Sequence, residues 1–270
     1  MNLTSPSQVK AWCIENDFHP NKTMGQNFLI DRNALVGIVD AGLRPVEGKS
    51  SPNVLEIGPG LGVLTEELLS RGCSVTAVEK DPVLAARLKT ALGEPSGLSV
   101  VPGDALDYIA AADLSGFDCM VSNLPYQAGT RILLELVQSR AIASMTVLVQ
   151  SEVAERLAAA EGSKTRGLAG VWAQLDYDVE IVRKVAASCF WPRPEIGSSV
   201  VRLVRHDRNS GLSAEERDIF HRLTKKAFEH RRKQLGSIFK DLIQSTARAE
   251  QLSNEDWIDL VKGLMASEDA

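Results

Sequence analysis

The stretch SNLPY follows an apolar run and brings polar and aromatic groups together at one turn. Asn123 offers a side-chain oxygen and Leu124 a backbone carbonyl, while Pro125 makes the turn rigid. Two such acceptors can hold the hydrogens of an exocyclic adenine amino group out of the ring plane, which localises the nitrogen lone pair for attack on a methyl group. Tyr126 offers a face for base stacking, worth about 1–3 kcal/mol. The stretch predicts base methylation by positioning, without a strong base; the alternative is a proline turn with a packing tyrosine.

A glycine-rich turn, LEIGPGLG, comes earlier in the chain. Gly58 and Gly60 would let a ligand approach the backbone without a side chain in the way. Glu79 follows about 20 residues later, where a carboxylate can accept both ribose hydroxyls of an adenosine. Val63 stands where a dinucleotide site needs its third glycine, and Glu56 would repel a pyrophosphate but can help to hold an ammonium group. The turn therefore favours S-adenosylmethionine over a dinucleotide; the alternative is a tight turn without a ligand.

Asp104, in VPGDAL, follows the third apolar run after residue 53. In that place its carboxylate can accept a hydrogen bond from the adenine amino group of the cofactor. It can equally serve as the N-cap of a following helix.

Alternating patterns predict the elements that position these residues. Apolar runs predict strands at 53–58, 74–79, 98–104, 117–123 and 145–150, and helical patterns occupy 61–72, 81–93, 130–139 and 151–160. Near-continuous apolar strands separated by helices are typical of a parallel sheet that is covered on both faces. We therefore expect a doubly wound α/β domain.

The last third of the chain changes character. Two more strands are expected at 178–185 and 198–205, separated by a loop broken by prolines. Beyond them strand signals cease, and Ser213 with Glu216 forms a capping-box start to a helix. Ser253 with Asp256 is a weaker version for the last helix. We expect an α/β domain over residues 1–205 and a helical domain over residues 206–270.

The composition is that of a folded globular protein, with 44% hydrophobic and 24% charged residues. No apolar run approaches the ~20 residues of a membrane span, and the start of the chain has no signal-like core. We expect a cytoplasmic protein. The four cysteines lie far apart, without a spacing typical of zinc, so reduced thiols and no metal site are expected: Cys13, Cys73, Cys119 and Cys189.

Charge is unevenly distributed along the chain. Residues 221–240 carry a net charge of +6, although the whole chain carries −5 and the remaining 250 residues therefore carry −11. A solvated helix face is the alternative for such a run. We interpret it as an RNA-docking surface, formed by Lys225, Lys226, Arg231, Arg232 and Lys233.

Longer motifs extend in order along almost the whole chain: GQNFLID, EIGPGLGVLT, VEKD, GDAL, SNLPY and FWPRPEIGSSVVRL. Together they resemble the motifs of the ribosomal small-subunit RNA adenine dimethyltransferases, and AFEHRRKQL is similar to the basic C-terminal helix of that family. The resemblance implies a class I methyltransferase domain with a mostly parallel seven-stranded sheet, and a small helical domain that docks on RNA. It implies transfer of two methyl groups from S-adenosylmethionine to N6 of each of two adjacent adenines near the 3′ end of small-subunit rRNA. The expected partner is the pre-30S particle, and the expected state is a monomer.

The resemblance also implies roles for individual residues. Asn27 and Leu29 are expected to join Gly58, Glu79, Asp104 and Asn123 around the cofactor. Phe190 is expected to flank the target base opposite Tyr126. Three positions depart from the family pattern: Gly197, Ala128 and Ser151.

Other functions share some of these features. A large-subunit rRNA adenine methylase of the antibiotic-resistance type has the same motifs, and the extension beyond Arg205 favours the small-subunit enzyme. A ribosome-assembly or transcription factor with a retained methylase fold would bind RNA without turnover, but the intact motif residues oppose it. DNA adenine methylases usually begin the corresponding tetrapeptide with Asp, whereas this chain has Asn123, so that activity fits less well.

Overall fold

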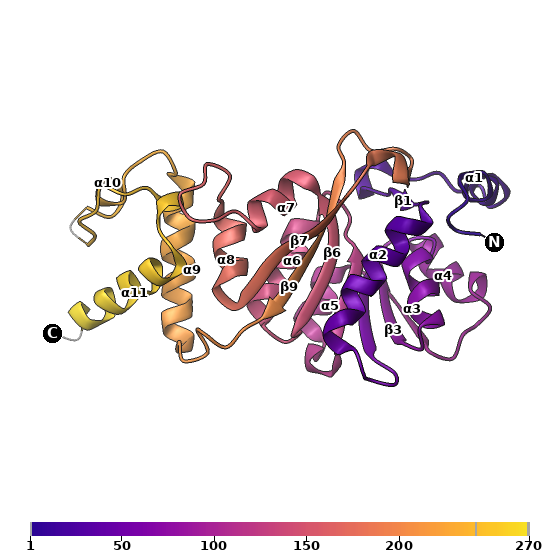
Figure 1. Cartoon of the computed structure of the whole chain (residues 1–270), viewed down its shortest axis with the longest axis horizontal. Coiled ribbons are helices and arrows are strands. Elements are labelled where there is room, and N and C mark those ends of the chain that lie inside the picture. Colours follow the sequence, from indigo (N-terminus) through magenta and orange to yellow (C-terminus); the bar gives the residue numbers. More distant parts are fainter. Residues whose placement is uncertain (1, 241, 269–270) are drawn as a thin grey trace. The chain divides into compact units, whose positions relative to one another are not determined.

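The computed structural model describes residues 2–240 and 242–268. They form two compact units (Figure 1). The first comprises residues up to Ala154 together with Glu180–Arg205, and the second comprises Glu155–Val179 together with the residues from His206 onward. The predicted division between residues 205 and 206 assigned the segment 155–179 to the first domain, whereas in the structure this segment groups with the second unit. A domain boundary at that point stays a prediction.

A seven-stranded sheet runs through the first unit in the order β4-β3-β2-β5-β6-β9-β7. Neighbouring strands from β4 to β6 are parallel, and β9 is antiparallel to β6. The predicted class, a doubly wound and mostly parallel sheet, is confirmed. The strands are β2 (Asn53–Ile57), β3 (Ser74–Glu79), β4 (Leu98–Pro102), β5 (Cys119–Asn123), β6 (Ser144–Gln150), β7 (Tyr177–Val185) and β9 (Ser198–Arg205).

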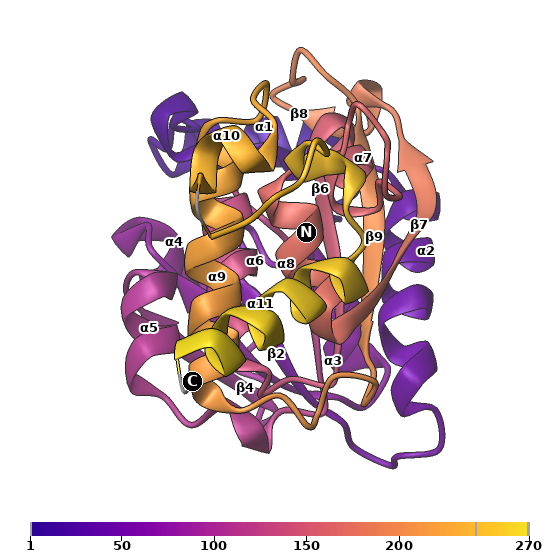
Figure 2. The same cartoon turned by 90° about the vertical axis from the view of Figure 1, so that its left-hand side faces the viewer.

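Helices cover both faces of this sheet because its strands are apolar on both sides. The helix α2 packs beside α3 on one face, and α5 packs beside α6 on the other (Figure 2). A separate two-stranded ladder pairs β1 (Phe28–Leu29) with β8 (Phe190–Trp191). The helices are α1 (Pro6–Glu15), α2 (Arg32–Leu43), α3 (Val63–Ser70), α4 (Pro82–Ala91), α5 (Ala105–Ala111), α6 (Gly129–Ser139) and α7 (Ser151–Leu157).

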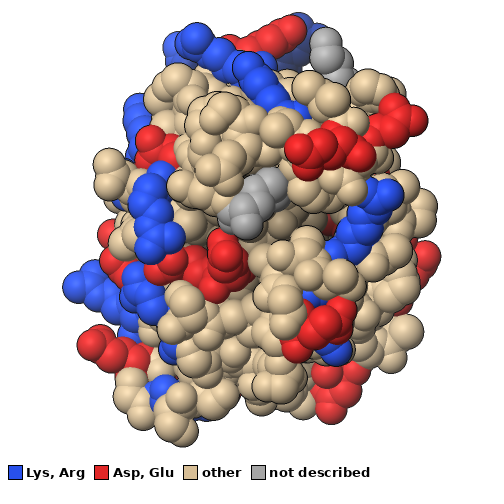
Figure 3. All heavy atoms as spheres, turned by 90° about the vertical axis from the view of Figure 1, so that its right-hand side faces the viewer, with Lys and Arg blue, Asp and Glu red and all other residues tan. Residues whose placement is uncertain are grey.

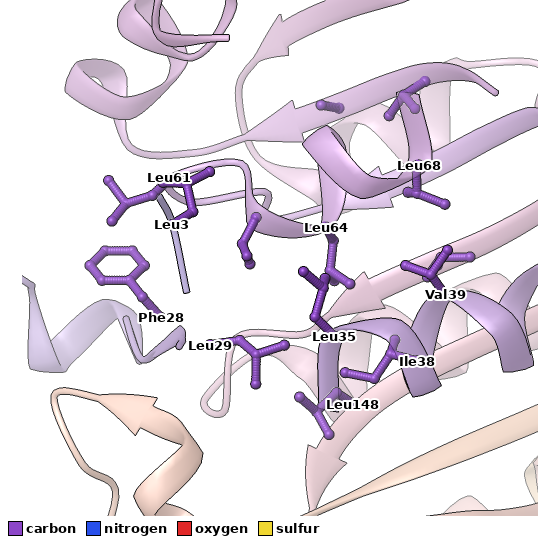
Figure 4. Packing of buried hydrophobic residues seen from close by; sticks show 14 of the residues in the cluster. Leu3, Phe28, Leu29, Leu35, Ile38, Val39, Leu61, Leu64, Leu68 and Leu148 are labelled. Carbon is purple, nitrogen blue, oxygen red and sulfur yellow. The ribbon is translucent and has the colours of Figure 1, made fainter. Parts of the chain in front are cut away.

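The core of the first unit joins the N-terminal segment to the sheet. Figure 4 shows side chains of α2 facing those of α3, with Leu148 of β6 beneath them. Leu3, Phe28 and Leu61 lie together at one end of this cluster. The segment before α2 is therefore fixed beside the glycine-rich turn by apolar burial, which stabilises by about 25 cal/mol per Å² removed from water.

The second unit is built around α8 (Leu168–Asp176), α9 (Ala214–Glu229), α10 (Leu235–Phe239) and α11 (Asn254–Glu268), shown in Figure 2. The helix α8 contributes Val171 and Leu175 to the same buried cluster as α9 and α11. Arg217 of α9 also forms a 2.7 Å ion pair with the buried Asp176. These contacts explain why the segment 155–179 groups with the C-terminal helices.

Local signals in the sequence mark several helix starts correctly. Ser213 and Glu216 exchange both hydrogen bonds of a capping box. Asp256 accepts from the Ser253 backbone at 2.8 Å, and the Ser253 hydroxyl accepts from the Asp256 backbone at 3.0 Å. The predicted helix 151–160 ends earlier, at Leu157.

Three of the four cysteines are buried, Cys189 is half-buried, and all four are free thiols. Burial raises the pKa of Cys119 to about 12. Within the described residues, no helix has the length and apolar character needed to cross a membrane.

Candidate active site

A cavity of about 460 Å³ opens where β2 and β5 lie side by side. The chain proceeds from β2 through β3 to β4 on one side of this point and from β5 to β6 on the other. Ligands of open α/β sheets bind outside the carboxyl ends of the strands at such a switch point. The predicted catalytic and cofactor residues all line this cavity: Asn27, Leu29, Gly58, Gly60, Glu79, Asp104, Asn123, Leu124, Pro125 and Tyr126.

The glycine-rich turn between β2 and α3 depends on left-handed backbone. Gly58 has φ +68° and Gly60 has φ +59°, which glycine adopts without a steric penalty. A Cβ on Gly60 would come within 3.1 Å of the Phe28 ring. The turn therefore needs glycine at residue 60 for both conformation and space.

Glu79 connects this turn to the end of β3. Its buried carboxylate accepts hydrogen bonds from the backbone N–H of Gly60 at 3.0 Å and of Asp81 at 2.8 Å. Burial raises the pKa of Glu79, and these bonds act in the opposite direction. Each carboxylate oxygen can accept a further hydrogen bond, so Glu79 fits the predicted role of ribose acceptor.

Glu56, at the base of the turn, is only 1% exposed and lines the cavity. It accepts a 2.7 Å hydrogen bond from the Thr65 hydroxyl. Burial raises its pKa to about 8, and the nearby Glu79 adds to the rise. A cation bound in the cavity would favour the ionised carboxylate.

Asp104 has the position expected of both interpretations. Its carboxylate caps α5 by accepting from the Leu106 N–H at 2.9 Å, and it borders the cavity. Lys80 forms a 2.8 Å ion pair with the same carboxylate and is the main cause of its lowered pKa. Lys80 also lines the cavity, a role that no local signal in the sequence indicated.

The turn after β5 is held at each residue. The Leu124 N–H donates to the Leu148 carbonyl at 3.1 Å, and the Pro125 carbonyl accepts from the Gly129 N–H at 2.7 Å. The Asn123 side-chain N–H donates to the Asn27 carbonyl at 3.2 Å. The Asn123 Oδ1 atom is buried and has no hydrogen-bond partner among the described residues. An acceptor of this kind costs free energy unless a ligand uses it.

The two aromatic residues predicted to hold the base differ in position. Tyr126 lines the cavity, and its hydroxyl forms a 2.6 Å hydrogen bond with the Ser198 hydroxyl. Phe190 is only 2% exposed, pairs with Leu29 in the β1–β8 ladder, and is not among the residues that line the cavity. Its role opposite Tyr126 stays a prediction.

The segment before β1 borders the cavity more extensively than its motif indicates. A Cβ on Gly25 would come within 3.0 Å of the Tyr126 backbone nitrogen. Gln26 donates to the Asp81 carboxylate at 2.8 Å. Thr23 and Met24 also line the cavity. The motif GQNFLID predicted two residues of this border, Asn27 and Leu29. The contacts of Gly25 and Gln26 are with residues far along the chain, which local sequence does not show.

The basic stretch lies in the second unit and is not a single helix face. The helix α9 ends at Glu229, so Arg231, Arg232 and Lys233 follow it in a turn. Arg231 is held by the Lys164 carbonyl and by Glu250, with its Nε atom 3.6 Å from the carboxylate.

The other cations of the stretch are more exposed. The Lys226 ammonium lies 5.4 Å from the centre of the Phe239 ring, while Lys225, Arg232 and Lys233 are exposed.

The first unit has a different distribution of charge on the face that carries α1. There, basic and acidic side chains are interspersed (Figure 3).

The residues around the cavity fit S-adenosylmethionine. Glycine backbone at residues 58 and 60 leaves space for a ligand, and the Glu79 carboxylate faces that space. Val63 stands where a dinucleotide site has its third glycine, and the buried Glu56 carboxyl, whose ionised form a bound cation would favour, suits an ammonium group. The fold and this site define a class I methyltransferase that depends on S-adenosylmethionine.

The chain belongs to the ribosomal RNA adenine dimethylase family, which matches residues 17–264. A protein of Deinococcus radiodurans named ribosomal RNA small subunit methyltransferase A is 45% identical over 204 residues, or 74% of this chain and 67% of that protein. The protein of that name from Mycobacterium bovis is 36% identical over 298 aligned positions, covering 100% of this chain and 91% of the relative.

Solved structures share the fold. A dimethyladenosine transferase from Plasmodium falciparum has a TM-score of 0.75 at 23% identity, covering 89% of this chain and 98% of its own. The 23S rRNA methyltransferase ErmE has a TM-score of 0.65 at 23% identity, covering 88% of this chain and 99% of its own.

Family membership confirms the predicted enzyme class and cofactor. The chain is an S-adenosylmethionine-dependent rRNA adenine methyltransferase.

Proposed function

We propose that this enzyme dimethylates N6 of two adjacent adenines in the hairpin near the 3′ end of small-subunit rRNA. The names of the two curated relatives support the choice of subunit. The expected substrate is the pre-30S particle, and the expected place of action is the cytoplasm, where such particles would meet a monomeric enzyme.

The observation that carries the proposal is the environment of Asn123. Its side-chain nitrogen donates a hydrogen bond to the Asn27 carbonyl, and this bond sets the orientation of the side-chain amide. The buried oxygen of the same amide has no hydrogen-bond partner among the described residues. An adenine amino group has two hydrogens to donate. Asn123 Oδ1 and the Leu124 carbonyl can accept one each, as the sequence predicts.

S-adenosylmethionine supplies the electrophilic methyl group when it is bound. The protein residues then act by position: Asn123 and Leu124 localise the lone pair of the adenine nitrogen, Pro125 limits the motion of the turn, and Tyr126 stacks on the base. The nitrogen loses one proton for each methyl group that it gains. No strong base is required for that loss.

The remaining roles concern the substrate. Phe190 is proposed to flank the base opposite Tyr126, which requires the β1–β8 ladder to expose its ring. The predicted RNA-docking residues of the second unit, Lys225, Lys226, Arg231, Arg232 and Lys233, are proposed to neutralise phosphates.

The deciding experiment incubates the protein with unmethylated small-subunit particles and isotope-labelled S-adenosylmethionine, followed by mass mapping of the RNA. Large-subunit particles serve as the matched control. Two neighbouring adenines that each gain two methyl groups, in small-subunit RNA only, are expected. Methylation confined to large-subunit RNA would indicate the resistance-type activity, and no transfer to either particle would overturn the proposal.

A further inference from the structure

A buried serine, Ser198, contacts Tyr126, the aromatic residue of the turn after Asn123. Ser198 is 0% exposed, and its hydroxyl lies 2.6 Å from the Tyr126 hydroxyl. A buried hydroxyl without a partner is costly, so each of these groups satisfies the other. Tyr126 itself is half-buried, with its hydroxyl on the protein side.

The sheet explains how Ser198 reaches this position. Ser198 begins β9 and pairs with Gln150, the last residue of the neighbouring β6. Asn123 ends β5 and pairs with Leu148 on the other side of β6. The Tyr126 ring therefore extends from the turn after β5 to β9. Tyr126 thus follows β5 along the chain, while its hydroxyl contacts the first residue of β9.

The start of β9 is itself fixed by two further bonds. The Ser151 N–H donates to the Gly197 carbonyl at 3.0 Å, and the Ser151 and Ser199 hydroxyls are 3.1 Å apart. Ser151 and Gly197 are two of the positions where this chain departs from the family pattern. Ser198 therefore belongs to a strand end that is anchored independently of the cavity.

We propose that Ser198 is a positioning residue that fixes the direction of the Tyr126 side chain and so holds its ring against the target adenine. This inference rests on the proposed function, because it assigns to Tyr126 the stacking face for the base. The hydrogen bond holds the tip of the ring and so opposes a swing of the side chain about χ1 away from the base. The adenine is then presented to Asn123 in one orientation. Ser198 acts through Tyr126 and touches neither substrate nor cofactor.

The test compares Ser198→Ala with Ser199→Ala. Ser199 is the adjacent residue of β9 and is also buried, but its hydroxyl partner is Ser151. Ser198→Ala should lower kcat/KM for the RNA roughly three- to tenfold, the range of one neutral hydrogen bond. The Kd for S-adenosylmethionine should stay unchanged in both variants. Ser199→Ala leaves the Ser151–Gly197 bond and the β6–β9 ladder in place, so it should lower kcat/KM much less than Ser198→Ala.

A double-mutant cycle with Tyr126→Phe separates positioning from general loss of structure. Both single variants remove the same hydrogen bond, so the double variant should lose little more activity than either one. Additive losses would contradict the proposal. If Ser198→Ala does not fold, Tyr126→Phe still removes the bond while keeping the ring, and wild-type kcat/KM in that variant would also contradict it.

A spectroscopic measurement tests the contact without any RNA. The chain has three tyrosines, so labelling with 3-fluorotyrosine gives a small set of ¹⁹F resonances, and Tyr126→Phe identifies the one from Tyr126. Ser198→Ala should shift and narrow that resonance alone. An unchanged resonance, or a changed one with unchanged kcat/KM, overturns the positioning role. Failure of the wild type to methylate small-subunit RNA would instead overturn the proposed function.

Discussion

The cofactor cavity and the basic stretch of the second unit both gather polar side chains, but they hold them in opposite ways. Around the cavity, Glu56 and Glu79 are buried, and Asn123 is fixed through the Asn27 carbonyl. In the basic stretch, Arg232 and Lys233 are exposed, and Arg231 is tied to its own unit. The cavity has few charges, held in fixed positions, whereas the stretch has many, most of them on exposed side chains.

This difference follows from what each region has to do. A methyl transfer depends on position, and small displacements of the reacting groups cost large factors in rate. Attraction to phosphates depends on charge at longer range and tolerates side-chain motion. Changes in the cavity should therefore have large and specific effects, and changes in the stretch should have smaller, salt-dependent ones.

The largest effect is expected for Asn123→Ala. It removes the unpartnered oxygen from the site of the amino group, so methyl transfer should fall by about 10²-fold or more. The Kd for S-adenosylmethionine, measured by calorimetry, should change little. Turnover at the wild-type rate in this variant would remove the basis for the catalytic role of the turn.

Glu79→Ala should have the reverse pattern. Loss of a charged acceptor for the ribose hydroxyls should weaken cofactor binding roughly tenfold or more. Glu66→Ala, which removes an exposed carboxylate from the neighbouring α3, is the control and should bind normally. Equal affinities of the two variants by calorimetry would show that Glu79 does not hold the ribose.

The raised pKa of Glu56 makes the stability of the cofactor-free protein depend on pH. An acid that binds its proton more tightly when folded contributes stability below its unfolded pKa of 4.5 and loses it as pH rises toward about 8. The free energy of unfolding should therefore fall between these values, by up to about 1.4 kcal/mol per pH unit. Denaturant titrations across this range should show a smaller fall for Glu56→Gln. Identical pH dependence in both proteins would contradict the assignment.

The smallest effect is expected for the pair Arg232→Gln and Lys233→Gln. If each side chain contacts one phosphate, the slope of log affinity for small-subunit particles against log salt should become shallower by about 1.4 to 1.8. Lys10→Gln with Lys89→Gln, two exposed cations of the first unit, changes the net charge equally and should leave the slope unchanged. Arg231 is left unchanged in this test because its bonds to the Lys164 carbonyl and Glu250 would make a loss of structure hard to separate from a loss of phosphate contact. Equal slopes in both double variants would mean that this part of the stretch is a solvated surface.

Local sequence contained the information for the part of the site nearest the chemistry. Gly58 follows β2, while Glu79 and Asn123 end β3 and β5, and apolar runs predict all three strands. Parallel strands bring their carboxyl ends to one edge of a sheet. The capping pattern at Ser213 likewise depends on residues only three apart. No helix was predicted over α2 or α8, and α5 was anticipated only through Asp104 as a possible N-cap.

The sequence by itself thus determined, through hydrophobic periodicity and residue type, the succession of strands along the chain, the glycine turn, the acid that follows it and the Asn123 turn. Tertiary structure alone decided which distant groups meet there. It set the Asn27 carbonyl against Asn123, Ser198 against Tyr126 and Lys80 against Asp104, buried Phe190, and grouped residues 155–179 with the C-terminal helices. Most of these outcomes depend on the packing of elements far apart in the chain, which no local pattern encodes.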